Sequence, residues 1–229
     1  MRRFVCMTLA LAVSLSLGAS VRSGEKAVSL FNGKDLTGWK LRGKDDKSKW
    51  IVGTAGVDDK GKLVFKKDGD EMVNTAGGGI DIYSDASFGD CLVEVEVMVP
   101  KGSNSGIYLM GRYEIQVLDS FGREKLGMGD MGAIYSVAIP KLNACKKAGE
   151  WQKYVVDFQA PRFDGTKKTA NAKFLKVELN GLIIHENVEV TKGATGGALG
   201  AEVATGPLMF QGDHGPVAFR NVRVTPKGK

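Results

Sequence analysis

The chain is poor in the residue types that build common metal centres. It has three cysteines and two histidines, His185 and His214, and neither a Cys-x-x-Cys nor a His-Glu-x-x-His pattern occurs. This absence excludes zinc fingers and zinc proteases that depend on those ligand spacings. The net charge over 229 residues is only +6, and the lysines and arginines are scattered among acids. The sequence therefore predicts no nucleic-acid partner.

The longest uncharged apolar run, residues 4–17, lies near the amino terminus. Two arginines precede it and small residues follow it. This order is typical of a secretory signal peptide, and the run is short for a membrane span, which needs about 17–25 residues. We therefore expect a signal peptide over residues 1–23, cleavage within 19–24, and a secreted or periplasmic protein without stable membrane insertion. A membrane anchor or a buried helix is the alternative for this run.

The remaining residues, 24–229, show the period of β-strands, and no stretch has a helical period over three turns. Apolar and polar residues alternate through 91–99 and 151–160, and Asn180-Gly181 between two apolar runs predicts a hairpin. Further strands are expected at 29–31, 50–52, 62–65, 133–139, 207–211 and 217–224, with loops over 66–79 and 187–206. This pattern predicts one all-β domain, a two-sheet antiparallel β-sandwich with one concave, polar sheet.

Two cysteines, Cys91 and Cys145, lie beyond the predicted signal peptide. An oxidising compartment would permit a disulfide between them. Cysteine is also a common buried small hydrophobe. The sequence alone leaves the pairing open.

The segment 102–120 is the strongest candidate for a functional site. It is expected to form two strands joined by a tight turn at Met110-Gly111. In the second strand the side chains alternate between an apolar face, which is expected to meet the core, and a polar face: Tyr113, Ile115 and Val117 against Arg112, Glu114 and Gln116. Alternate side chains of a strand stand roughly 6.5–7 Å apart, about the spacing of hydroxyls along a sugar.

Glu114 and Asp119 are candidate proton-transfer residues for cleaving a glycosidic bond or for removing a proton beside a carbonyl. The spacing Glu-x-Gln-x-x-Asp resembles the Glu-x-Asp-x-x-Glu strand of β-sandwich glycosidases, with the amide of Gln116 at the centre. Asp119 lies at an odd offset from Glu114, so it reaches the same cleft only if the chain bulges or bends after Leu118. The alternative is a solvated strand face.

His214 is the candidate imidazole, because Gly212, Gly215 and Pro216 hold its loop in a special shape. It can serve as a base or a metal ligand, although a surface histidine is commoner. His185, within a strand, is expected to be structural. Glu114, Asp119 and His214 could together hold a divalent ion, but no spacing demands one, and no cofactor is assigned.

Two glycine-rich patterns do not mark the sites that they superficially resemble. Gly77-Gly78-Gly79 lacks the Gly-Lys-Ser/Thr of a phosphate loop, and Gly102–Gly106 has Asn104 where a serine hydrolase has its nucleophile. Asn104 is instead expected to shape the turn or contact sugar hydroxyls. Tyr135 is the aromatic residue expected in the cleft, whereas the three tryptophans are expected in the core.

Motifs in family order along nearly the whole chain resemble the DUF1080 family, the 3-keto-disaccharide hydrolase domain. These are Leu30–Trp39, Asn104–Tyr108, Tyr113–Asp119, Gly132–Tyr135, Gly149–Gln152, Asn180-Gly181, Gly206–Gln211, His214-Gly215 and Phe219–Asn221. The resemblance implies a concanavalin A-like jelly roll, related in shape to laminin G domains. It also implies cleavage of 3-keto-disaccharides or other 3-keto-glycosides by secreted or periplasmic proteins.

The resemblance also implies roles for individual residues. A ketone at C3 acidifies the proton at C2, so a base can remove that proton and the glycosidic oxygen can leave C1; hydration follows, or hydrolysis is direct. The proton-transfer candidates are Glu114, Asp119 and His214, and the residues expected to bind and polarise the carbohydrate are Arg112, Gln116, Tyr135 and Gln211. A carbohydrate-binding module of the same fold is the alternative. A structural interaction domain would show an exposed apolar patch instead.

Overall fold

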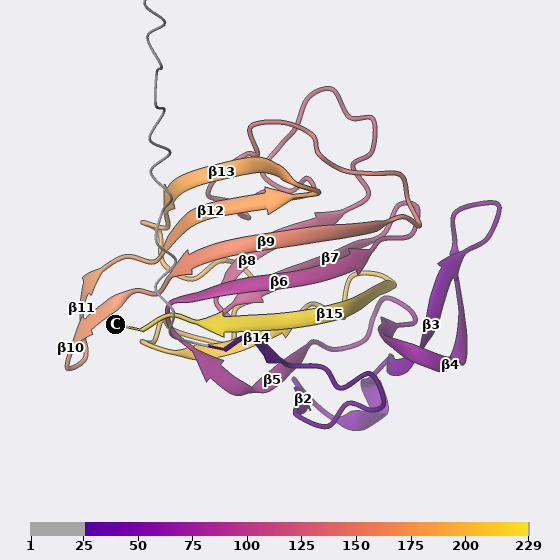
Figure 1. Ribbon diagram of the computed structural model, residues 1–229, viewed down its shortest axis with the longest axis horizontal. Helices are drawn as coiled ribbons and strands as arrows, with labels where there is room; N and C mark the ends of the chain where they lie inside the picture. The colour runs from indigo at the N-terminus through magenta and orange to yellow at the C-terminus, as the bar shows by residue number, and fades with distance from the viewer. Residues whose placement is uncertain (1–25, 229) are drawn as a thin grey trace, which may run out of the picture.

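The computed structural model describes residues 26–228, so the predicted signal peptide, residues 1–23, lies outside the described residues. Two antiparallel sheets face one another in a sandwich (Figure 1), as the sequence predicts. The one helical element of the described part is a single 3-10 turn, η1 (Asp45–Lys47). No helix within 26–228 has the length and apolar character that crossing a membrane would require.

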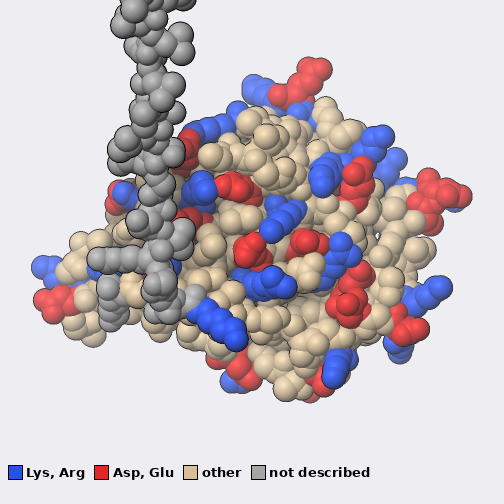
Figure 2. All heavy atoms as spheres, viewed as in Figure 1, with Lys and Arg blue, Asp and Glu red and all other residues tan. Residues whose placement is uncertain are grey.

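The larger sheet has the order β13-β12-β9-β6-β15-β4-β3, with β1 also paired to β15. Its bounds are β1 (Val28–Ser29), β3 (Trp50–Val57), β4 (Leu63–Asn74), β6 (Cys91–Met98), β9 (Trp151–Gln159), β12 (Lys173–Leu179), β13 (Leu182–Glu189) and β15 (Val217–Pro226). On the face seen in Figure 2, basic and acidic side chains are interleaved. Lys153 pairs with Glu94 at 2.9 Å and Arg220 with Glu96 at 2.7 Å on this sheet.

The smaller sheet has the order β2-β5-β14-β7-β8 and lies behind the larger one in Figure 1. Its bounds are β2 (Trp39–Leu41), β5 (Ile82–Phe88), β7 (Asn104–Leu109), β8 (Tyr113–Leu118) and β14 (Gly206–Phe210). A separate hairpin, β10 (Arg162–Asp164) and β11 (Lys167–Ala170), extends from one end. This topology places the segment 104–118 at one edge of the smaller sheet.

The core lies between the two sheets and joins them through aromatic pairs. Phe210 of β14 stacks on Phe219 of β15 with ring centroids 3.9 Å apart, and Tyr113 of β8 lies 5.5 Å from Phe158 of β9. All four side chains are fully buried. Each such burial stabilises the fold by about 1.5–3 kcal/mol. The apolar face of β8 is therefore anchored, and its polar face must point away from the core.

Both predicted turns are confirmed by their backbone angles. Asn180 and Gly181 have φ values of 55° and 82°, and Met110 and Gly111 have 55° and 63°. Positive φ at both central residues suits the right-handed twist of the strands that the turn joins. The second turn fixes the register of β7 and β8, in which Tyr108 pairs with Glu114 and Gly106 with Gln116.

Several local predictions were wrong. The expected strand 133–139 is irregular; its backbone covers the edge of β8, where Gln116 N–H donates to Ala133 O at 2.9 Å. The expected loop at 66–74 is part of β4, whose outer half forms a projecting arm with β3 (Figure 1). Because that arm is exposed on both faces, it lacks the alternation that marks a half-buried strand. Strands β2, β5, β10 and β11 were not predicted.

The tryptophan and cysteine predictions have mixed outcomes. Trp39 and Trp50 are buried in the core as expected. Trp151 is not in the main core: it is half-buried and the Arg220 guanidinium lies 3.9 Å from its ring centroid. The sequence left open whether Cys91 and Cys145 form a disulfide. In this structure both are buried free thiols.

Candidate functional site

A cavity of about 350 Å³ lies over the polar face of the smaller sheet. It collects six of the residues predicted from the sequence: Asn104, Glu114, Gln116, Tyr135, Gln211 and His214. Six others complete the lining: Arg42, Asp81, Tyr108, Gly196, Gly197 and Asp213. Segments that are more than a hundred residues apart in sequence thus meet over one hollow, lined by carboxyl, amide, imidazole and guanidinium groups.

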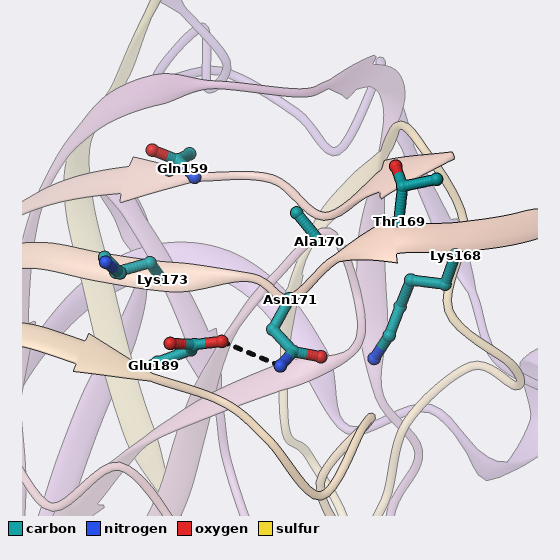
Figure 3. Close-up of a pocket in the computed structure, with 7 residues that line it drawn as sticks. All are labelled: Gln159, Lys168, Thr169, Ala170, Asn171, Lys173 and Glu189. Carbon is teal, nitrogen blue, oxygen red and sulfur yellow. Dashed lines mark hydrogen bonds between the residues drawn. The ribbon is translucent and has the colours of Figure 1, made fainter. Parts of the chain in front are cut away.

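A second depression of about 350 Å³ lies between the β10–β11 hairpin and the neighbouring strands (Figure 3). Its lining includes Asn171 and Glu189, which are joined by a 2.8 Å hydrogen bond, and none of the predicted site residues. Two lysines line it, Lys168 and Lys173, and the ammonium of Lys168 is paired with Glu202 at 2.7 Å. Because this depression gathers none of the predicted site residues, the candidate chemistry is assigned to the first cavity.

Glu114 reaches the cavity because β8 alternates and because its partner strand has a glycine. Its side chain leans over Gly106 of β7, where an added Cβ would lie 2.3 Å from the Glu114 Oε1. Only a residue without a side chain leaves space for the carboxyl there. The Glu114 N–H donates to Thr195 Oγ1 at 3.0 Å, which holds the backbone of this strand edge.

Replacing Gly106 with alanine is expected to displace the Glu114 carboxyl and to lower activity about 100-fold, because misplacement of a reacting group by 1 Å has an effect of that order. The control is Gly129→Ala, since nothing lies within 4 Å of a Cβ at that position. Activity and thermal unfolding of both variants should be measured. Full activity in a folded Gly106→Ala protein would show that the carboxyl position is unimportant.

Burial dominates the electrostatics of Glu114. The side chain is 2% exposed, and burial raises the pKa of its carboxyl from 4.5 to about 8. Among the smaller contributions to this pKa, a hydrogen bond that Tyr108 gives to the ionised carboxylate lowers it, and the negative charges of Asp81 and Asp213 raise it. Glu114 is therefore mostly a neutral carboxylic acid at pH 7, able to donate a hydrogen bond.

This raised pKa predicts that folding stability falls with rising pH. The unfolded chain releases the Glu114 proton near pH 4.5, whereas the folded chain keeps it until about pH 8. The free energy of unfolding therefore falls by roughly 4–5 kcal/mol in total as the pH rises between these two values. We expect Glu114→Gln to remove this component, so the variant should gain stability over the wild type as pH rises from 4.5 to 8. Equal pH slopes in denaturant unfolding would contradict the prediction.

Two glutamine side chains stand beside Glu114 with incompletely bonded amides. Gln116 Nε2 donates to Asn104 Oδ1 at 2.6 Å, and Gln211 Nε2 donates to the Tyr108 hydroxyl at 3.4 Å. Within residues 26–228, the Oε1 atoms of both glutamines are buried and accept no hydrogen bond. Buried polar atoms are normally bonded, so unpaired acceptors in a cavity are candidates for ligand contact.

His214 stands at the rim, with its side chain 48% exposed. Its Nδ1 is hydrogen-bonded to Asp213 Oδ1. Because a carboxylate oxygen accepts, Nδ1 carries the proton of this bond, and Nε2 is the ring nitrogen that has a lone pair in the neutral form of the imidazole. The loop is held by Asn74 Nδ2, which donates to the carbonyls of Gly212 and Gly215 at 3.0 and 2.8 Å.

The triple glycine 77–79 packs beneath the His214 loop. The Gly78 N–H donates to Asp213 O at 2.7 Å, and a Cβ at Gly77 would lie 2.6 Å from His214 O. Its glycines therefore permit close approach of two backbones. This contact accounts for the motif without a phosphate ligand.

The loop after β13, residues 190–205, forms one wall of the cavity. Arg42 bridges from the Asp81 carboxylate to the carbonyls of Gly197 and Ala198. The Tyr108 hydroxyl donates to Gly196 O at 3.0 Å. Arg42, Asp81, Tyr108 and Asp213 were not predicted as site residues. Of these, Tyr108 carried a usable signal, since the register set by the turn places it opposite Glu114.

Asp119 and Arg112 do not join the cavity, contrary to expectation. β8 stays regular to Leu118, so Asp119 turns away; its Oδ2 accepts from Gly102 N–H at 2.9 Å, beside a different depression. Arg112 lies in the turn before β8 and donates to the carbonyls of Met110 and Ala201, both at 3.0 Å.

The proposed metal trio therefore does not assemble. Across residues 26–228, no group of three or more histidine, cysteine, aspartate or glutamate side chains is placed to hold a metal ion. His185 is buried, with Nε2 2.8 Å from Gly132 O, and takes no part in the cavity.

Comparisons with known proteins found relatives of the same fold. A crystal structure from Parabacteroides distasonis ATCC 8503, named as a candidate glycosyl hydrolase, is 27% identical with a TM-score of 0.67, covering 88% of this chain and 84% of that one. Another from that organism, similarly named, is 20% identical with a TM-score of 0.61, covering 88% and 94%, and shows the fold alone. No curated protein matches the chain.

A family model also matches residues 26–225, nearly the whole described part of the chain. Its description is "3-keto-alpha-glucoside-1,2-lyase-like domain". The match includes every residue that lines the cavity. The resemblance found in the sequence is therefore confirmed: the chain belongs to the 3-keto-disaccharide hydrolase (DUF1080) family, whose model carries that lyase-like description.

Proposed function

We propose that the chain cleaves 3-keto-glycosides by removing the proton at C2 and releasing the group bound through oxygen at C1. The observation that carries this proposal is the neutral carboxyl of Glu114, held against Gly106 on the floor of a polar cavity. A carboxylic acid kept neutral in an enzyme site can donate a hydrogen bond to a carbonyl oxygen on which charge develops. The family description and the glycosyl hydrolase relatives support a carbohydrate substrate.

His214 is assigned as the base. With Nδ1–H donated to Asp213, Nε2 takes the proton from C2, and the C–H electron pair forms the C2=C3 double bond of an enolate. Glu114 donates a hydrogen bond to the C3 oxygen as its charge grows. The C3 oxygen then re-forms the carbonyl, the C2=C3 electron pair moves to C1=C2, and the C1–O bond breaks; the leaving oxygen takes the proton from His214. Addition of water to the resulting enone completes hydrolysis.

We propose further that the protein acts outside the cytoplasm after removal of residues 1–23. The basic, apolar and small residues in that order support this location. The amino-terminal residue of the protein recovered from its native cells, determined by mass spectrometry, tests it. A mature protein that begins at Met1 would contradict the proposal.

The direct test of the activity is to incubate the protein with a 3-keto-α-glucoside disaccharide and with its unoxidised parent. We expect release of the leaving sugar, and transient enone absorbance, from the oxidised substrate only, because the C2 proton is acidic only beside a ketone. Binding without release would favour the carbohydrate-binding alternative. Cleavage of the unoxidised parent at a similar rate would contradict the elimination route.

A further inference from the structure

Three polar side chains lie in a row across the floor of the cavity, with Gly106 at its centre. On one side Gly106 pairs with Gln116 of β8, and on the other its carbonyl accepts from the Gln211 N–H at 3.0 Å. The carboxyl of Glu114 occupies the space above Gly106 itself. The two glutamines therefore flank the carboxyl, Gln116 from β8 and Gln211 from the residue that follows β14.

The outer members of this row present oxygen atoms. While Glu114 is neutral, the Tyr108 hydroxyl gives its single proton to Gly196 O at 3.0 Å, so it can only accept from Gln211, which leaves the Gln211 Oε1 for a ligand. Gln116 Nε2 donates to Asn104, and the Gln116 Oε1 has no hydrogen-bond partner among the described residues. Gln116 is 4% exposed and Gln211 8%, and both unpartnered oxygens are buried. An amide oxygen cannot stabilise an enolate; it can only accept a hydrogen bond.

We infer that the floor of the cavity recognises a sugar ketone that is flanked by two free hydroxyls. The Oε1 atoms of Gln116 and Gln211 each accept a hydrogen bond from one hydroxyl. The Glu114 carboxyl donates a hydrogen bond to the carbonyl oxygen between them. The assignment of this ligand as a 3-keto-glycoside ring rests on the proposed function. In a 3-keto-glycoside the 2-hydroxyl, 3-ketone and 4-hydroxyl form this donor–acceptor–donor row. The neutral state of Glu114 at pH 7 supports the central donor.

This recognition has a consequence for the substrate class. A sugar unit linked onward through O4 has no hydroxyl proton at that position, so one of the two glutamine oxygens would stay unpaired. Sites built to bond a hydroxyl reject analogues that lack it, because their own polar groups are then left buried and unpaired. The chain should therefore act on a terminal 3-keto unit whose 2- and 4-hydroxyls are both free.

Calorimetric binding to the His214→Ala variant tests the inference, because that variant keeps the floor and is expected to turn substrate over at least about 100-fold more slowly. The probes are a 3-keto-α-glucoside and its 4-deoxy and 4-O-methyl analogues. We expect each analogue to bind about 10-fold more weakly than the parent, the size of one hydrogen bond. Introducing Gln211→Met and Gln116→Met separately should then reveal which glutamine reads the 4-hydroxyl.

For that glutamine, binding of the 4-deoxy probe to the methionine variant should be no weaker than the weaker of the two single changes, because both changes remove the same hydrogen bond. Gln159→Met, the same change in the depression of Figure 3, is the control and should leave the affinity unchanged. Three results would overturn the inference. The losses of affinity could add for both glutamines, the analogues could bind as well as the parent, or none of the sugars could bind. Hydroxyl-dependent binding without cleavage by the wild type would refute the proposed activity and keep the inference.

Discussion

Replacing Glu114 with leucine is expected to lower kcat/KM for a 3-keto-glycoside by about 10²–10³-fold, because removal of one preorganised donor to a developing oxyanion has that effect. Glu114→Gln should retain part of the activity, since an amide N–H can still donate to the C3 oxygen. In the wild type, kcat/KM should fall as pH rises through about 8, where Glu114 loses the proton that it donates. Steady-state kinetics from pH 6 to 10 measure all three.

The matched control is Glu124→Gln, an exposed glutamate away from the cavity, which should leave kcat/KM unchanged. If Glu114→Gln is as inactive as Glu114→Leu, and wild-type activity rises through pH 8 instead, then Glu114 is the base and the roles given to Glu114 and His214 are reversed. A pH profile without a transition near 8 would indicate that Glu114 does not change its proton state in the rate-limiting step.

His214→Ala is expected to lower kcat about 10²–10⁴-fold, the usual contribution of general base catalysis. Because the His214 side chain is 48% exposed at the rim, imidazole added to the solution should restore part of the activity. Asp213→Asn should cause a smaller loss, since it orients the ring and keeps the proton on Nδ1.

The combination of loss and rescue separates a chemical role from a structural one. A variant damaged only in its loop would not respond to imidazole, and Asn74→Ala, which removes two hydrogen bonds to that loop, provides the comparison. Undiminished kcat in His214→Ala would remove this histidine from the mechanism.

Local alternation in β8 was sufficient to predict its buried face and the position of Glu114, because a strand has a strict period of two. The same rule also warned against Asp119, whose odd offset needed a bulge that the structure lacks. Arg42 and Asp81 could not be predicted, since they meet the cavity only through the order of strands in the smaller sheet and through loops. No local pattern in a sequence encodes such long-range contacts.

The predicted convergence of Glu114, Gln211 and His214 came from the resemblance to a family, and the structure places all three on one cavity. The projecting half of β4 shows the opposite case. Its residues are exposed on both faces, so no burial constrains their order and no alternation survives in the sequence. Prediction therefore succeeded where a core or a ligand site limits the choice of residue.

The wall of residues 190–205 is held in place largely by hydrogen bonds to its main chain. Arg42 holds the carbonyls of Gly197 and Ala198, Tyr108 holds that of Gly196, and Arg112 holds that of Ala201. A carbonyl is present whatever amino acid occupies the position, so much of this grip survives substitution of outward-pointing side chains. Substitution of those side chains should therefore change the surface of this wall while its main chain, and the floor of the cavity, stay in place.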